Sequence, residues 1–336
     1  MLVTSEDLLN KARAGGYAIP SPDFVDSNSA RAFVRVAEEM GAPIILSFAE
    51  VHLDQMALDE AAALGTFYAR KASVPVALHL DHGKRMDVIE EAIRLGFTSV
   101  MIDASNEELS ENIRRTKEVV ELAHAHGVYV EAEIGHVGAE DAEGPHALSG
   151  IEYTEVDSAK QLVEATGVDS LAVSIGTVHG TYKGEPCINF ERLAELKAAL
   201  AVPLVLHGGS GSGDENLARC ARGGVAKVNL YTDFIVAALA AVYEQRPDHW
   251  LKLLGAGDAR GLAALLPRAG LRAVGQGERR LFTREGDAFH DHERRAGIAF
   301  AERLRGGQGG GGRADRDRFA LRRRRPRPYH VQDRHG

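Results

Sequence analysis

Histidine and acidic residues stand at the ends of apolar, β-type segments of this sequence. They are Asp81, His82, Glu133, His179 and His207. Neutral imidazole nitrogens with a carboxylate nearby are ligands that zinc and similar divalent ions take in proteins, and a catalytic site leaves a position open for substrate. One such histidine alone is more often an ordinary loop or core residue. Three of them, each at a strand end, predict a metal site at one mouth of the fold.

Glycine follows all three of these histidines, and the loops that begin at His179 and His207 suggest anion binding as a second function. Without a Cβ, the backbone N–H groups of a glycine-rich loop can approach an anion closely. A glycine run alone could be a flexible link, but this one begins at a predicted metal ligand. In parallel barrels the loops after the seventh and eighth strands often bind phosphate. The residues expected to form this phosphate cradle are Gly180, Gly208, Gly209, Ser210, Asn229 and Thr232.

Eight short β-type runs must position these groups. They cover residues 17–19, 43–48, 74–80, 99–102, 128–134, 170–175, 203–206 and 226–230. Amphipathic stretches lie between them, and several end at glycine, as expected for helices, at Gly41, Gly96, Gly127, Gly167 and Gly223. Near-continuous apolar strands are typical of a parallel sheet buried on both faces. The pattern predicts a (β/α)8 (TIM) barrel. An open doubly wound sheet is the alternative, although no Gly-x-Gly-x-x-Gly follows the first run.

Composition indicates an ordinary globular chain in a reduced compartment. The 336 residues are 44% apolar, and Cys187 and Cys220 are too few for a disulfide framework. We find no signal peptide and no apolar run of the roughly 20 residues that a bilayer requires. We therefore expect a cytoplasmic protein without membrane partners.

Charge divides the chain into two compositions. Residues 1–245 carry 19 Lys and Arg against 37 Asp and Glu, whereas 246–336 carry 21 against 11. We predict a barrel domain over 1–250, a helical segment over 251–304, and an Arg- and Gly-rich, disordered tail over 305–336. A basic tail could contact nucleic acid, but such ends are usually solvated, so no nucleic-acid partner is expected.

Four motifs together resemble one enzyme family. They are HLDHG at 79–83, VEAEIG at 130–135, GTVHG at 176–180 with YKG at 182–184, and HGGSG at 207–211. In this order they are similar to class II fructose- and tagatose-bisphosphate aldolases, and most similar to the tagatose-bisphosphate branch. The resemblance covers about residues 5–245. It implies a homodimer or homotetramer that acts on a small phosphorylated sugar.

The resemblance also implies roles for individual residues. His82, His179 and His207 would hold Zn²⁺, and Glu133 would reach the ion in an alternate position. Gly180 and Ser210 match positions that also line a monovalent-cation site. The phosphate-loop residues named above match those that hold the dihydroxyacetone-phosphate end and the loop after the eighth strand.

Two acids would move protons during an aldol cleavage. A cation on the ketone oxygen stabilises the carbanion left when the C3–C4 bond breaks, so no Schiff-base lysine is required. Asp81 matches the family's catalytic aspartate and would take the C4 hydroxyl proton. Glu140, in a Gly-rich segment after the fifth strand, would then protonate C3. We expect reversible cleavage of a ketose 1,6-bisphosphate, fructose or tagatose, to dihydroxyacetone phosphate and glyceraldehyde 3-phosphate.

Several departures from the family keep other functions open. The segment Pro20–Asp23 differs, Tyr231 replaces a small, polar or acidic residue, and residues 262–336 match nothing in the family. On these grounds the alternative substrate is another phosphorylated ketose or a deoxy-keto sugar acid. A non-catalytic sugar-phosphate-binding barrel and a metal-dependent hydrolase are the alternatives from other classes.

Overall fold

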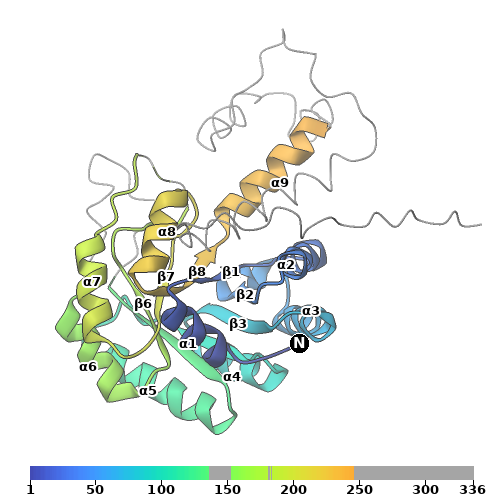
Figure 1. Cartoon of the computed structure of the whole chain (residues 1–336). Helices are drawn as coiled ribbons and strands as arrows, with labels where there is room; N and C mark the ends of the chain where they lie inside the picture. Colours follow the sequence, from blue (N-terminus) through green and yellow to red (C-terminus); the bar gives the residue numbers. More distant parts are fainter. Residues whose placement is uncertain (136–152, 181, 183, 246–336) are drawn as a thin grey trace, which may run out of the picture. The chain divides into compact units, whose positions relative to one another are not determined.

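Eight parallel strands form a barrel in the computed structural model (Figure 1), which describes residues 1–135, 153–180, 182 and 184–245. The strands are β1 Ile19–Pro22, β2 Ile44–Ala49, β3 Val76–Gly83, β4 Ser99–Ile102, β5 Tyr129–Ile134, β6 Ser170–Val173, β7 Leu204–Leu206 and β8 Val225–Leu230. They are hydrogen-bonded in the order β1-β8-β7-β6-β5-β4-β3-β2. The predicted (β/α)8 fold is confirmed. The predicted boundaries at 250 and 305, with the helical segment and the tail, lie outside the described residues.

Helices alternate with the strands, and α2 to α8 surround the barrel (Figure 1). They are α1 Ser5–Gly15, α2 Ser27–Met40, the 3-10 helix η1 Glu50–Asp54, α3 Leu58–Lys71, α4 Met86–Leu95, α5 Leu109–Ala125, α6 Val156–Thr166, α7 Phe190–Ala199, α8 Asp214–Gly223 and α9 Thr232–Gln245. Left-handed glycines end α2, α4 and α6 where predicted, at Gly41, Gly96 and Gly167. For α8 the left-handed residue is Gly224, one position later than predicted, with φ 116°.

The first strand differs from its prediction, which placed it at residues 17–19 instead of Ile19–Pro22. Its two prolines explain this difference, and they also interrupt the pairing of β1 with β2. Neighbouring N–H groups in a strand point to opposite sides, and Asp23 N donates to Leu230 in β8 while Phe24 N donates to Ser47 in β2. The backbone nitrogens of Pro20 and Pro22 point to the same side as that of Phe24, toward β2. Proline has no N–H, so neither can donate to β2. The barrel therefore closes between β1 and β2 through a single bridge, Asp23 to Ser47.

Helix α1 closes the end of the barrel where the strands begin. Its Leu8, Leu9 and Ala12 pack against Ile19, Ile45, Ala77, Tyr129 and Ala226, which are fully buried or nearly so. Sealing this end with apolar contacts leaves the opposite end, where the strands finish, as the open mouth.

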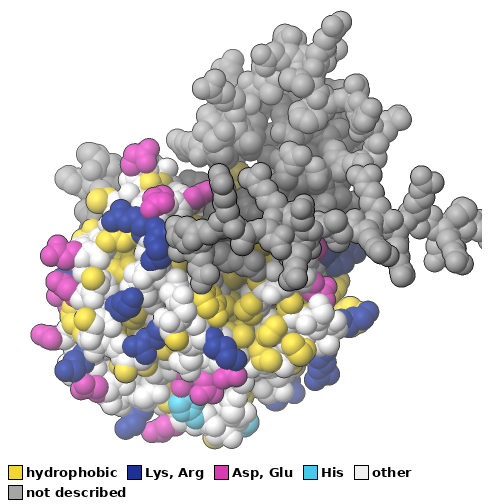
Figure 2. Space-filling view, in the orientation of Figure 1, with side chains coloured by type: hydrophobic (Ala, Val, Ile, Leu, Met, Phe, Trp, Pro, Cys, Tyr) yellow, Lys and Arg dark blue, Asp and Glu magenta, His cyan; other side chains and the backbone are white. Residues whose placement is uncertain are grey.

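Acidic and basic side chains are interspersed over the barrel face seen in Figure 2. Exposed pairs such as Arg94 with Glu91 and Arg114 with Glu111 lie one helical turn apart, and pairs of this kind contribute little to stability. Among the described residues, no helix combines the length and the apolar character needed to cross a membrane.

Candidate active site

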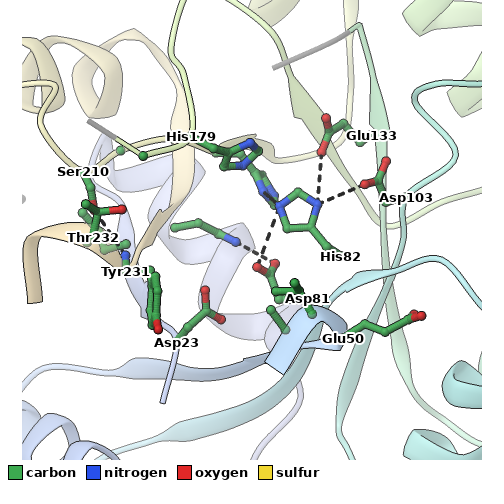
Figure 3. Close-up of a pocket in the computed structure, with 18 of the residues that line it drawn as sticks. Asp23, Glu50, Asp81, His82, Asp103, Glu133, His179, Ser210, Tyr231 and Thr232 are labelled. Carbon is green, nitrogen blue, oxygen red and sulfur yellow. Dashed lines mark hydrogen bonds and ion pairs between the residues drawn. The ribbon is translucent and has the colours of Figure 1, made fainter. Parts of the chain in front are cut away.

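A pocket of about 570 Å³ opens at the ends of the strands (Figure 3). This is the mouth at which barrel enzymes carry their active sites. Eleven of the predicted site residues line it: Asp81, His82, Glu133, His179, Gly180, His207, Gly208, Gly209, Ser210, Asn229 and Thr232. The twelfth, Glu140, falls in the range 136–152, outside the described residues.

A bulge in β3 brings two neighbouring residues, Asp81 and His82, to the same pocket. Side chains normally alternate between the two faces of a strand. Here the pairing of β3 with β4 shifts register between Leu80 and Gly83, and His82 has φ 47°, a left-handed conformation that is uncommon outside glycine. The predicted strand stopped at Leu80, so the structure places Asp81 and His82 inside β3 and not after it.

Three imidazole rings converge above this bulge. Ligand atoms of His82, His179 and His207 all lie within 4.8 Å of one another. The ring centroids are 4.5 Å apart for His82 and His207, 5.0 Å for His82 and His179, and 6.0 Å for His179 and His207. Nε2 of His82 faces Nδ1 of His207 at 2.8 Å.

The outer nitrogens of two rings are held by carboxylates. Nδ1 of His82 lies 3.1 Å from Asp103 Oδ2, and Nε2 of His207 lies 2.9 Å from Glu131 Oε1. A carboxylate accepts the ring N–H, so each neutral histidine presents a lone pair from its other nitrogen, and on His82 a bound cation would take the place of a proton. Those two lone pairs are on the atoms that face each other at 2.8 Å. This donor set fits a divalent cation, and carboxylate-bound histidines are typical of zinc sites.

The acidic residues around the histidine cluster also favour a positive charge there. Burial opposes protonation of the His82 ring, but Asp81, Asp103 and Glu133 outweigh it and raise its pKa to about 10. Burial and the nearby Asp103 charge raise the pKa of Glu133 to about 8. Glu133 Oε2 is buried, has no hydrogen-bond partner among the described residues, and lies 3.9 Å from His82 Nδ1. A buried carboxylate oxygen without a donor is costly, so Glu133 is suited to meet a cation.

Asp81 is ionised and oriented by its neighbours. Burial opposes ionisation, but His82 and, further off, Lys227 lower its pKa below the usual value. Asn229 Nδ2 donates to Asp81 Oδ1 at 2.7 Å, while Asp81 Oδ2 lies 3.9 Å from His82 Nε2. One oxygen is therefore fixed, and the other faces the pocket beside the histidine cluster, as a base that acts on a bound substrate would require.

Ser210 joins the two loops predicted to bind phosphate. Its hydroxyl oxygen accepts the backbone N–H groups of Tyr231 and Asp233, both at 3.2 Å, at the start of α9. With both lone pairs used, the hydroxyl proton is the group left to donate to an anion. The N-terminus of a helix also attracts negative charge.

Tyr182 ties the loop of His179 to the loop of His207. Its hydroxyl accepts the N–H of Val178 at 3.2 Å and lies 3.3 Å from the carbonyl oxygen of Gly208 and 3.0 Å from Ser212 Oγ. These contacts fix the relative position of two predicted metal ligands and the glycine loop.

The Gly208→Ala substitution tests the glycine loop. Gly208 has φ 65°, and a Cβ there would lie 2.5 Å from the carbonyl oxygen of Val178. We expect the loop to shift and the KM for a phosphorylated substrate to rise about tenfold or more, which is the loss of about 1.4 kcal/mol of binding. Gly213→Ala is the matched control, because Gly213 also has a positive φ, 80°, but open space around it. Equal KM values for the two variants in a steady-state assay would contradict a steric role of Gly208.

The sequence prediction gave no role to five functional neighbours: Asp103, Glu131, Tyr182, His52 and Asp23. Asp103 directly follows β4. A polar residue at the end of a strand is the pattern that identified the predicted metal ligands, so Asp103 could have been found. Glu131 is a charged residue inside an apolar strand, which signals an internal pairing. His52, in η1, and Asp23 belong to the pocket lining with no motif to mark them.

A parallel barrel with three convergent histidines, an aspartate of lowered pKa and glycine loops at its open mouth is the arrangement of a barrel enzyme with a candidate metal site. Residues 3–265 match the family model "Fructose-bisphosphate aldolase class-II". The chain belongs to the class II fructose-bisphosphate aldolase family. It is therefore an enzyme, a carbon–carbon lyase of the aldolase type.

The chain is also similar to two relatives and to a solved structure. "Uncharacterized protein YdjI" of Escherichia coli K12 is 41% identical over 244 residues, which are 73% of this chain and 87% of that protein. "Probable fructose-bisphosphate aldolase" of Bacillus subtilis 168 is 38% identical over 255 residues, 74% of this chain and 89% of that protein. The crystal structure of the YdjI aldolase is similar with a TM-score of 0.71 at 30% identity, covering 90% of this chain and 97% of that one.

Proposed function

We propose that the chain reversibly cleaves a ketose 1,6-bisphosphate, fructose or tagatose, to dihydroxyacetone phosphate and glyceraldehyde 3-phosphate, with Zn²⁺ in the three-histidine site. One observation supports this most strongly. The histidine cluster, the ionised Asp81 and the glycine-rich loops all line one pocket, so a phosphorylated ketose held by its phosphate could place its ketone beside the histidines.

Each group has a task in this reaction. Gly208, Gly209 and Ser210, with the start of α9, would bind the C1 phosphate through N–H and O–H donors. Asp81 would accept the C4 hydroxyl proton as the C3–C4 bond breaks, and Asn229 would keep its carboxylate turned toward that hydroxyl. Glu140 stays the predicted acid for C3.

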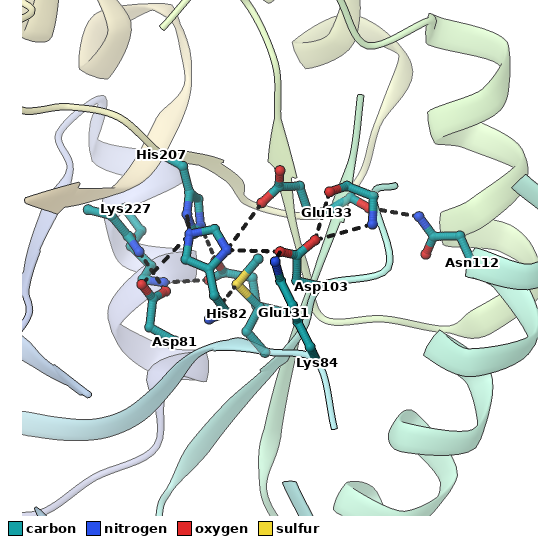
Figure 4. Close-up of polar contacts among 12 residues, drawn as sticks. Asp81, His82, Lys84, Asp103, Asn112, Glu131, Glu133, His207 and Lys227 are labelled. Carbon is teal, nitrogen blue, oxygen red and sulfur yellow. Dashed lines mark hydrogen bonds and ion pairs between the residues drawn. The ribbon is translucent and has the colours of Figure 1, made fainter. Parts of the chain in front are cut away.

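The three histidines and Glu133 would hold the zinc ion. When bound, zinc would polarise the ketone and stabilise the negative charge that develops as the bond breaks. The backbone position of Glu133 is set by Asn112, whose side chain donates to the Glu133 carbonyl oxygen at 2.9 Å (Figure 4). The monovalent cation predicted near Gly180 and Ser210 belongs to the same proposal.

The side of the pocket across from Asp103 and Glu133 favours a second substrate class. Among the described lining residues, Lys84 is the one lysine or arginine against the carboxyl groups of Asp23, Glu50, Asp81, Asp103 and Glu133. Lys84 Nζ lies 3.7 Å from Asp103 Oδ2, on the side of the histidines. Lys84 thus already faces a carboxylate, and no other lysine or arginine among the described lining residues is placed to bind a second phosphate.

Asp23 and Tyr231 lie across the pocket from Asp103 and Glu133 (Figure 3), and His52 lines the pocket against Tyr231. The rings of His52 and Tyr231 pack with centroids 4.7 Å apart. Burial and the Asp81 charge raise the pKa of Asp23 well above its usual value, and Asp23 Oδ1 has no hydrogen-bond partner in the described part of the chain. A neutral carboxyl group suits a sugar hydroxyl, so these residues favour a ketose 1-phosphate with a hydroxylated far end.

A coupled triose-phosphate assay tests both substrates. Fructose and tagatose 1,6-bisphosphates, ketose 1-phosphates and a phosphorylated deoxy-keto sugar acid would be compared, with and without chelator. We expect triose phosphate from at least one ketose phosphate, with activity lost to chelator and restored by Zn²⁺. Release of inorganic phosphate without triose phosphate would instead indicate a hydrolase, and no turnover of any sugar would refute the proposal.

A further inference from the structure

A chain of buried hydrogen bonds runs beneath the histidine cluster (Figure 4). Lys227, in β8, donates from Nζ to Glu131 Oε2 at 2.7 Å and to His79 Nε2 at 3.1 Å. The other oxygen of Glu131 lies 2.9 Å from His207 Nε2. The side chains of Lys227, Glu131 and His207 are at most 1% exposed.

These contacts determine which ring nitrogen carries the proton in His79 and in His207. Lys227 can only donate, so His79 Nε2 must accept, and the N–H of His79 is then Nδ1, which lies 2.8 Å from Ser99 Oγ. Glu131, as a carboxylate, only accepts, so His207 carries its N–H on Nε2. The lone pair of His207 is consequently on Nδ1, the atom that faces His82.

Lys227 is not part of the pocket wall. It is absent from the residues that line the pocket, and its amino group lies between His79 and Glu131, in the barrel interior. His79, Asp81 and Glu131 could by their spacing hold a metal ion, but the ammonium group of Lys227 already fills this place with a positive charge. Any effect of Lys227 on the reaction must therefore pass through other residues.

We propose that Lys227 is a positioning residue for the metal site: its ammonium group holds Glu131 as an oriented carboxylate, and Glu131 in turn directs the Nδ1 lone pair of His207 into the three-histidine cluster. This inference rests on the metal site of the proposed function. A buried carboxylate without its cation would either take up a proton or pull in water. In both cases His207 would lose its fixed acceptor and could rotate or change tautomer. Loss of a residue that orients a metal ligand commonly lowers metal affinity about 10–100-fold.

Zinc affinity, measured by competition with a chromophoric chelator, tests this without recourse to activity. The variants are Lys227→Met, Glu131→Gln and the double variant, each first checked in metal-free form for a cooperative thermal transition. We expect the zinc Kd of Lys227→Met to rise about 10–100-fold. The double variant should recover part of this loss, because the amide oxygen introduced by Glu131→Gln can still accept from His207 without a buried charge. The visible absorption band of the cobalt(II)-substituted Lys227→Met chain should shift as the ligand geometry relaxes.

Thr166→Val is the matched control for loss of a buried polar group. Its hydroxyl donates to Leu162 within α6, outside the pocket, so stability should change and zinc Kd should not. A folded Lys227→Met chain with the wild-type zinc Kd overturns the inference. If Lys227→Met does not fold, Glu131→Gln decides, because Lys227 then competes with His207 for the single amide oxygen: a rise of about 10–100-fold supports the inference, and a wild-type Kd overturns it. If the wild-type chain binds no zinc, the proposed metal site itself is refuted.

Discussion

The Asp81→Asn chain is expected to bind zinc normally and to cleave its substrate about 10²–10⁴ times more slowly, the range that a positioned general base contributes. The substitution keeps the shape of the side chain, and an amide oxygen can still accept from Asn229, as Asp81 Oδ1 does at 2.7 Å. It removes the negative charge of the side chain and with it the ability to take up a proton. The loss should fall on kcat, with little change in KM, because the base acts in the transition state.

Asp103→Asn is the matched control for Asp81→Asn. It makes the same chemical change on another buried carboxylate of the same pocket, but Asp103 contacts His82 Nδ1 and has no expected contact with substrate. We expect zinc affinity to fall in this variant and kcat at saturating zinc to fall less than in Asp81→Asn. Zinc content would be measured by atomic emission and kcat by the triose-phosphate assay. An Asp81→Asn chain with full zinc content and near wild-type kcat would show that Asp81 is not the base.

His179→Ala is expected to have the largest effect on the metal. A catalytic zinc site usually has three protein ligands, and His179 supplies one of the three convergent nitrogens. Removing it should lower zinc occupancy at equimolar metal to a small fraction and cleavage by about 10³-fold or more, because the ion provides several kcal/mol of transition-state stabilisation. Zinc should also stop raising the melting temperature, since a ligand stabilises a fold only when it binds.

His52→Ala provides the control for His179→Ala. His52 is another histidine of the pocket, packed on Tyr231 at 4.7 Å and not part of any group of metal-ligand spacing in the described residues. Its removal should leave zinc occupancy unchanged and act on substrate selection alone. A His179→Ala chain that retains one tightly bound zinc, or a His52→Ala chain that loses it, would place the metal elsewhere.

The positions of the strands and of the ligand-bearing loops could be predicted from the sequence because each depends on local pattern. A continuous apolar run followed by a polar residue marks a buried parallel strand and the mouth to which it leads. The same pattern failed for β1, where Pro20 and Pro22 prevent pairing with β2 and the apolar run at 17–19 covers only one residue of the strand.

The finer geometry of the site arises from contacts that no local pattern reports. Lys227 and Glu131 are 96 residues apart and meet only when the barrel closes. The left-handed conformation of His82 belongs to a bulge between two paired strands, and nothing in the local run of residues marks it. Asp103 was predictable from its place after β4, but its partnership with His82 requires the register of β3 and β4.

Diffraction from zinc-loaded crystals at the zinc absorption edge is the most direct test that three histidines hold the catalytic ion. An anomalous peak is expected at about 2.0–2.1 Å from His82 Nε2, His207 Nδ1 and one ring nitrogen of His179, the usual zinc–nitrogen distance. An anomalous peak at any other group of side chains would contradict the account. So would the absence of a peak at the three histidines when the crystallised enzyme requires zinc for activity.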